Sequence, residues 1–176
     1  MKELLIGCGS LKNKRLLWTE KGESPEWEGE LITLDNNKTH SPDVIWDLNW
    51  RPLPFKDDEF DRIHAYEVLE HIGKQGEVEL FFEEFYEYWR ILKPDGELRG
   101  TCPLWTSQWA WGDPSHTRVI TPGTFTFLSQ KAYKDVGKNV MSDFRHLWKG
   151  DFEAAWVAAD QESLCFILKA IKKGGE

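Results

Sequence analysis

The feature that most constrains this chain is an apolar strand that runs directly into a glycine turn. Leu4-Leu5-Ile6 is followed by Gly7-Cys8-Gly9, and the next strand-like run, 31–34, ends on Asp35. Small residues at the end of a strand let a ligand approach the backbone closely. An acidic side chain at the tip of the neighbouring strand can accept hydrogen bonds from both hydroxyls of a ribose. The two features together predict a site for a nucleoside.

Apolar runs of strand length recur along the first part of the chain. They span 3–6, 30–34, 43–46, 62–65 and 97–101, and polar residues, glycine or proline follow each of them. This spacing is typical of a parallel sheet. Two later runs, 152–159 and 163–171, are separated by a brief polar turn and predict an antiparallel hairpin that closes the sheet.

The helical patterns are fewer than the strand patterns. The clearest helix is predicted over 76–92, where apolar residues recur on one face and glutamates lie largely on the other. The turn over 93–96 contains proline and glycine and leads into the next strand. The segment 11–29 carries glycine, proline and scattered charges, so any first helix is expected to be short. A later helix is predicted over 122–133, with Thr121 as its N-cap.

Length and charge limit the possible functions. A chain of 176 residues is long enough for one domain with a substantial core, and we expect a single domain over 1–176. The net charge of -8 argues against a broad surface for duplex nucleic acid, because such affinity comes largely from clustered lysine and arginine.

The cysteines and the apolar runs indicate a cytoplasmic protein. Cys8, Cys102 and Cys165 lie far apart and form no C-x-x-C pair, so neither a disulfide framework nor a metal site is predicted. A reducing compartment fits this pattern best. No apolar run approaches the roughly 20 residues of a membrane span, and no membrane association is expected.

A set of short motifs follows in a fixed order along the chain. In order, they are Gly7-Cys8-Gly9-Ser10, Asp47-Leu48, Pro54-Phe55, Asp57 to Phe60 with Asp61, Val68-Leu69-Glu70-His71 and Ile91-Leu92-Lys93-Pro94-Asp95-Gly96. The ordered set resembles the class I S-adenosylmethionine-dependent methyltransferases, strongly over 4–103 and weakly beyond. The resemblance implies an α/β, Rossmann-like, doubly wound and mostly parallel seven-stranded sheet, with a C-terminal antiparallel hairpin and a reduced first helix. It also implies S-adenosyl-L-methionine as the cofactor.

The resemblance implies a role for each matched position. Gly7 and Gly9 would lie under the methionine part of the cofactor, Asp35 would bind the ribose, and Asp47 would face the adenine amino group. The full set of implied cofactor-binding residues is Gly7, Cys8, Gly9, Asp35, Asn36, Asp47, Leu48, Tyr66 and Glu67. Any one of these residues alone could instead form a turn or a cap. A dinucleotide fold keeps a third glycine for a pyrophosphate, and Lys12 in that place favours a nucleoside without phosphates.

The segment after the fifth strand is the candidate acceptor site. Trp105, Trp109 and Trp111 lie in a stretch without helical periodicity, so we expect them, with Arg118, to form the walls and lid for an acceptor. Alternatively, the tryptophans pack on the domain's own helices or on a second subunit. His116 is the candidate general base, because its ordinary pKa of about 6.5 suits proton transfer near neutrality; it could instead anchor the loop.

These observations predict a methyltransferase that acts on a small-molecule, sugar-like or nucleotide acceptor. Its cofactor half would span 1–103, and the acceptor loop and closing elements would span 104–171. His64-Ala65-Tyr66-Glu67 replaces the Asp-Pro-Pro-Tyr type of motif used on DNA amines, which disfavours duplex DNA. The alternative is a catalytically degenerate, cofactor-binding partner subunit. The tryptophan segment could then form a homodimer or bind a partner protein.

Overall fold

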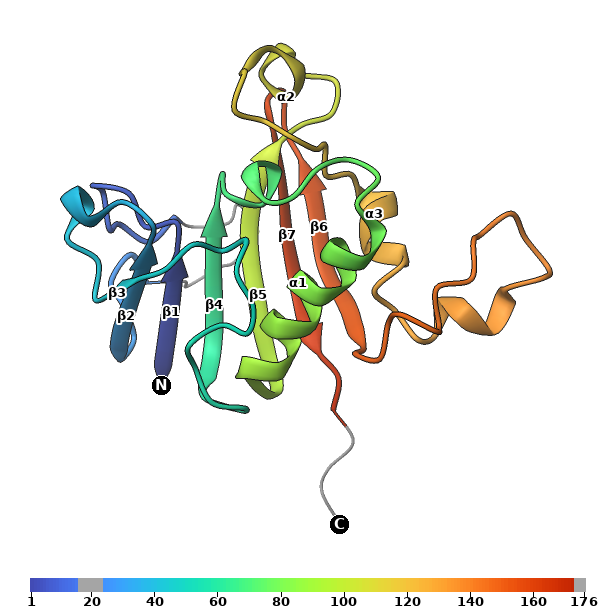
Figure 1. The fold of residues 1–176 in the computed structure, drawn as a ribbon, viewed down its shortest axis with the longest axis horizontal. Helices are drawn as coiled ribbons and strands as arrows, with labels where there is room; N and C mark the ends of the chain where they lie inside the picture. The colour runs from blue at the N-terminus through green and yellow to red at the C-terminus, as the bar shows by residue number, and fades with distance from the viewer. Residues whose placement is uncertain (16–23, 173–176) are drawn as a thin grey trace.

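The computed structural model describes residues 1–15 and 24–172, which form a seven-stranded sheet in the order β3-β2-β1-β4-β5-β7-β6 (Figure 1). The strands are β1 (Lys2–Ile6), β2 (Glu30–Asp35), β3 (Val44–Ile45), β4 (Phe60–Tyr66), β5 (Leu92–Pro103), β6 (Phe152–Ala159) and β7 (Ser163–Ala170). The first five strands pair in parallel, whereas β7 pairs antiparallel with both β5 and β6. The predicted α/β sheet with a C-terminal hairpin is confirmed.

The helix α1 (Val78–Ile91) crosses one face of the sheet and builds the main core (Figure 1). Its apolar stripe, including Phe82 and Phe85, packs in one cluster with Leu4 and Ile63 of the central strands. Burial of such a stripe is what stabilises an amphipathic helix. The helix passes directly into β5, so the predicted turn over 93–96 lies inside that strand, where the pairing with β4 shifts register.

The predicted late helix over 122–133 is shorter in the structure. The helix α3 (Pro122–Thr126) begins as predicted, with a capping box between Thr121 and Thr124, but a separate 3-10 turn, η3 (Ala132–Asp135), follows it. The carbonyl oxygen of Leu128 accepts hydrogen bonds from the Phe152 amide and the Trp148 indole, each at 2.9 Å. A longer helix would need that oxygen for its own backbone, so these tertiary bonds end the helix.

Two connections bear on the sequence predictions. Between β1 and β2, the described residues contain no helix; residues 16–23 of the segment 11–29, where any first helix was expected to be short, lie outside the described part. The tryptophan segment, expected to be irregular, contains the short helix α2 (Gln108–Gly112). Within residues 1–15 and 24–172, no helix is long and apolar enough to cross a membrane.

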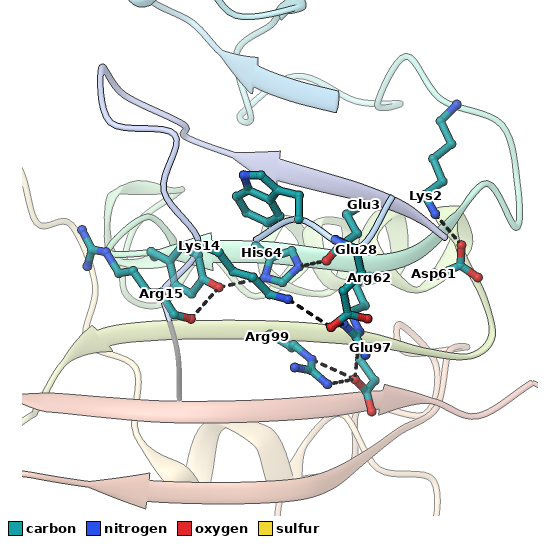
Figure 2. Close-up of polar contacts among 12 residues, drawn as sticks. Lys2, Glu3, Lys14, Arg15, Glu28, Asp61, Arg62, His64, Glu97 and Arg99 are labelled. Atoms are coloured by element: carbon teal, nitrogen blue, oxygen red, sulfur yellow. Dashed lines mark hydrogen bonds and ion pairs between the residues drawn. The ribbon is translucent and has the colours of Figure 1, made fainter. Parts of the chain in front are cut away.

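The face of the central strands opposite α1 carries a network of buried charges. Figure 2 shows Glu3 of β1 and His64 of β4 pointing toward each other, with Glu3 Oε2 2.8 Å from His64 Nε2. Both side chains are fully buried. The second oxygen of Glu3 accepts the Glu28 amide, and His64 Nδ1 lies 2.8 Å from the Tyr66 hydroxyl. Burial lowers the pKa of His64, so a buried hydrogen bond joins the two side chains; removing either partner leaves the other unsatisfied, and the network therefore favours this packing of β1 beside β4.

This network predicts acid sensitivity. Burial acts to raise the pKa of Glu3, but hydrogen bonds from His64 and the Glu28 amide lower it to about 2. Because the folded pKa lies below the unfolded one, Glu3 stabilises the fold above an ordinary glutamate pKa, and this stabilisation is lost as pH falls toward 2. Between about pH 5 and about pH 3, urea titrations should show the free energy of unfolding falling about 1–2 kcal/mol more in the wild type than in Glu3→Gln. Parallel losses in the two proteins would contradict this assignment.

Candidate functional site

The glycine turn after β1 takes a conformation that side chains disfavour. Gly7 and Gly9 have φ angles of +57° and +56°, in the left-handed region. A Cβ atom on Gly7 would also lie 2.5 Å from Val68 Cγ2, whereas one on Gly9 would meet no heavy atom within 4 Å. The turn therefore packs tightly on one side and leaves open space on the other.

Asp35 fastens the end of β2 to this turn. Its Oδ2 accepts a hydrogen bond from the Gly9 amide at 2.9 Å, and its Oδ1 accepts one from the Asn37 amide at 2.8 Å. His40 Nδ1 lies 3.2 Å from Oδ2. Although burial acts to raise the pKa of Asp35, the amides of Asn37 and Gly9 hold it below its ordinary value. The carboxylate is thus charged at neutral pH and retains acceptor capacity for a ligand.

A cavity of about 450 Å³ opens where β1, β2 and β4 end. Its lining residues are Gly7, Gly9, Leu34, Asp35, Asn36, His40, Trp46, Asp47, Leu48, Asn49, Glu67, Val68, His71 and Ile72. The structure thus brings most of the predicted cofactor residues to one cavity of the size that small ligands occupy. Cys8 and Tyr66 instead line a neighbouring cavity of about 340 Å³, which shares Gly7 and Gly9 with the first.

Sequence reasoning missed several residues of this cavity. Trp46 and Asn49 flank the predicted Asp47-Leu48 pair, and Asn49 donates from its backbone and side-chain nitrogens to Asp47 Oδ1, at 2.8 and 3.0 Å. Their position just after a strand could have indicated that they line the cavity. His40 gave no comparable signal, because its contact with Asp35 depends on the 3-10 turn η1 (Lys38–His40).

Glu67 lines the cavity in a strained backbone conformation. Its φ angle is +57°, which is uncommon for a residue other than glycine, and its amide donates to the Thr101 carbonyl at 2.9 Å. Such strain persists only where the surrounding structure holds it, and it concentrates at functional sites. The conformation keeps Glu67 at the mouth between the ends of β4 and β5.

Beside this mouth, three titratable side chains converge. Glu70 Oε1 lies 4.0 Å from both His71 Nε2 and His116 Nε2, and the two imidazole rings pack edge to face with centroids 4.7 Å apart. Burial raises the pKa of Glu70 to about 8. His71 lines the cofactor-side cavity, whereas the His116 side chain is largely buried. The segment reaches this position because the Thr117 and Arg118 amides both donate to the Glu70 carbonyl.

The structure places the predicted acceptor residues in two different environments. Trp105, Trp109 and Trp111 are 38%, 53% and 72% exposed; Trp105 precedes α2, the other two lie within it, and α2 itself lies beyond the end of β5 (Figure 1). None of them lines the 450 Å³ cavity. Arg118 is buried, with Nη2 2.6 Å from Glu84 Oε2 and with Nε donating to the Leu69 carbonyl at 2.8 Å. Arg118 thus ties the His116 segment to α1.

Breaking this ion pair should destabilise the protein. Arg118→Ala would leave the Glu84 carboxyl buried without its partner, and we expect the free energy of unfolding to fall by about 3 kcal/mol in a urea titration. Arg145→Ala is the matched control, because Arg145 pairs with Asp143 at the exposed surface. That variant should change stability by less than about 1 kcal/mol. Equal effects of the two substitutions would refute the anchoring role of Arg118.

The sequence matches one family model, described as a methyltransferase domain, over residues 4–99. This match spans more than half of the 176 residues and includes every residue that lines the 450 Å³ cavity. None of the curated proteins matches the chain.

Solved structures share the fold at low sequence identity. A SAM dependent methyltransferase from Archaeoglobus fulgidus has a TM-score of 0.54 and 17% identity, covering 96% of this chain and 85% of that one. A chain in the complex between the Haloferax volcanii Trm112 methyltransferase activator and a methyltransferase has a TM-score of 0.55 and 14% identity, covering 97% of this chain and 83% of that one. The [4+2]-cyclase SpnF has a TM-score of 0.58 and 13% identity, covering 97% of this chain and 74% of that one. At these identities the similarity shows the fold alone.

Proposed function

This chain belongs to the methyltransferase domain family, and from that premise we propose that it transfers a methyl group from S-adenosyl-L-methionine to a small-molecule, sugar-like or nucleotide acceptor. The observation that supports this most is the charged Asp35 carboxylate, held by the Gly9 amide at the edge of a cavity of about 450 Å³. A ribose presents two neighbouring hydroxyls, and a carboxylate at a strand tip is suited to accept from both.

The described residues fit this cofactor. Asp35 and Asn36 would hold the ribose, and Asp47, with the backbone of Leu48, would face the adenine. The open space above Gly9 would receive the methionine part, and the neighbouring cavity beside Cys8 and Tyr66 extends that space. Because the two cavities share Gly7 and Gly9, one elongated ligand could cross the turn from one to the other.

When bound, the cofactor supplies a methyl group on a positively charged sulfur, and the acceptor displaces that sulfur in line. The protein's contribution is to hold the acceptor's nucleophilic atom about 3 to 3.5 Å from the methyl carbon and to exclude water. We propose that Glu67 borders the methyl group and that Trp105, Trp109, Trp111 and Arg118 help to enclose the acceptor. The acceptor's proton would leave to His116 as general base.

A partner-binding role is the second candidate. The three tryptophans in and just before α2 are substantially exposed, and large apolar side chains gathered at a surface often mark an interface. A homodimer or a partner protein could cover them, and a structural neighbour comes from a complex with an activator protein. The fold can also serve other chemistry, since another neighbour is a cyclase. The three buried, free cysteines support a reducing, cytoplasmic location for either function.

Calorimetric titration with S-adenosylmethionine tests the cofactor assignment. Asp35→Ala should weaken binding at least tenfold, because both hydroxyl contacts and the link to the Gly9 amide are lost. Glu30→Ala is the matched control, since Glu30 is an exposed acidic residue at the opposite end of the same strand. That variant should bind like the wild type. Unchanged affinity in Asp35→Ala would place the ribose elsewhere, and no binding by the folded wild type would refute the cofactor itself.

A panel of small-molecule acceptors, followed by release of S-adenosylhomocysteine, separates the enzyme from the degenerate partner. For the enzyme, His116→Ala should lower turnover roughly a hundredfold or more while changing cofactor affinity less than about twofold. Turnover equal to that of the wild type would exclude His116 from catalysis. Cofactor binding without turnover on any acceptor would favour the partner role.

A further inference from the structure

We propose that Glu70, His71 and His116 form a binding site for one divalent transition-metal ion, of the class that includes Zn²⁺, Co²⁺ and Fe²⁺. One ligand atom from each side chain lies within 4.8 Å of the other two. Two imidazoles and one carboxylate are a donor set that these ions prefer, whereas Mg²⁺ and Ca²⁺ prefer oxygen ligands alone.

The geometry needs only a small contraction to accept an ion. Glu70 Oε1 lies 4.0 Å from the Nε2 atom of each histidine. Ligands at about 2.0–2.1 Å from a tetrahedral ion are separated from one another by about 3.4 Å. The two Glu70 contacts must therefore close by several tenths of an ångström, and the two imidazole nitrogens, which lie within 4.8 Å of each other, by up to about 1.4 Å.

The buried carboxyl group of Glu70 is independent evidence for a bound ion. Its side chain is 2% exposed, and its carboxylate oxygens meet no donor among the described residues except the weak thiol of Cys102 and the backbone amide of Glu70 itself. An unsatisfied carboxyl group is costly to bury. A metal ion bound at Oε1 would satisfy it.

The surroundings prepare His71 as a ligand, whereas His116 Nδ1 is buried without a hydrogen-bond partner among the described residues. His71 Nδ1 donates to the Ser115 carbonyl at 3.2 Å, which leaves its Nε2 lone pair facing Glu70. Such a bond from the second ring nitrogen to a carbonyl is the usual support of a metal-binding histidine. The Asp113 carboxylate, with Oδ2 3.8 Å from His116 Nε2, adds negative charge beside the site. The positive charge of the nearby Arg118 is paired with Glu84, whose Oε2 lies 2.6 Å from Arg118 Nη2.

The position of the site suggests its use. His71 also lines the 450 Å³ cavity, so an ion held by three protein ligands would keep an open position toward the mouth where the methyl group is proposed to lie. That position suits an acceptor with an oxygen donor, such as a hydroxyl beside a carbonyl or carboxylate. This use depends on the proposed methyl transfer, whereas metal binding does not. With an ion bound, His116 would be a ligand rather than the general base.

The test is a Co²⁺ titration of untagged protein from which metals have been removed, followed by visible absorption and by competition with Zn²⁺. We expect one ion per chain, bands of nitrogen- and oxygen-ligated Co²⁺, displacement by Zn²⁺ and no displacement by equimolar Mg²⁺. Glu70→Gln and His116→Ala should each weaken binding at least tenfold. His146→Ala, which removes an exposed histidine outside the cluster, is the matched control and should bind like the wild type.

Several results would overturn the site. These are no Co²⁺ binding by the folded wild type, equal binding by all variants, or equal weakening by His146→Ala. If His116→Ala fails to fold, Glu70→Gln and the wild-type spectrum still decide, because the amide keeps the size of the carboxylate. Calorimetry with S-adenosylmethionine on the same samples keeps the two proposals apart: cofactor binding without metal binding refutes only the metal site, and the reverse refutes only the cofactor site.

Discussion

The hydrogen bond from the Gly9 amide to Asp35 is the contact on which the proposed cofactor site depends. It joins β1 and β2 just beyond their last paired residues, Ile6 and Leu34, and adds to the hydrogen bond from the Cys8 amide to the Leu34 carbonyl. The bond requires the left-handed turn at Gly7 and Gly9, and Gly7 in turn leaves no room for a side chain beside Val68. One arrangement therefore positions the carboxylate, opens the space above Gly9 and fixes the floor of the cavity.

A second set of contacts brings titratable side chains to the mouth of that cavity. The backbone of Glu70 accepts the amides of Thr117 and Arg118, and the Arg118 side chain joins the same segment to Glu84 of α1. These contacts carry His116 to within 4.0 Å of Glu70 Oε1, although 46 positions separate them in the sequence. Backbone hydrogen bonds and a buried ion pair thus fasten the loop that carries His116 to η2 and α1.

The sequence was sufficient where the signal was local. The strand runs, the glycine turn and Asp35 could be placed because each depends on a few neighbouring residues. The ordered motifs indicated in which order these elements follow along the chain. The length of the helix after Thr121 could not be predicted, because distant groups take the Leu128 carbonyl. The ion pair between Arg118 and Glu84 could not be predicted either, because nothing near Arg118 in the sequence reveals Glu84. The convergence of Glu70, His71 and His116 is a purely tertiary feature.

The central claim is that the cavity beside the glycine turn binds the nucleoside of S-adenosylmethionine. A crystal structure with S-adenosylhomocysteine tests it most directly. The account predicts both ribose hydroxyls on the Asp35 carboxylate, the adenine beside Asp47 and Leu48, and the homocysteine part across Gly7 and Gly9. A ligand bound with its ribose away from Asp35, or outside this cavity, would contradict it.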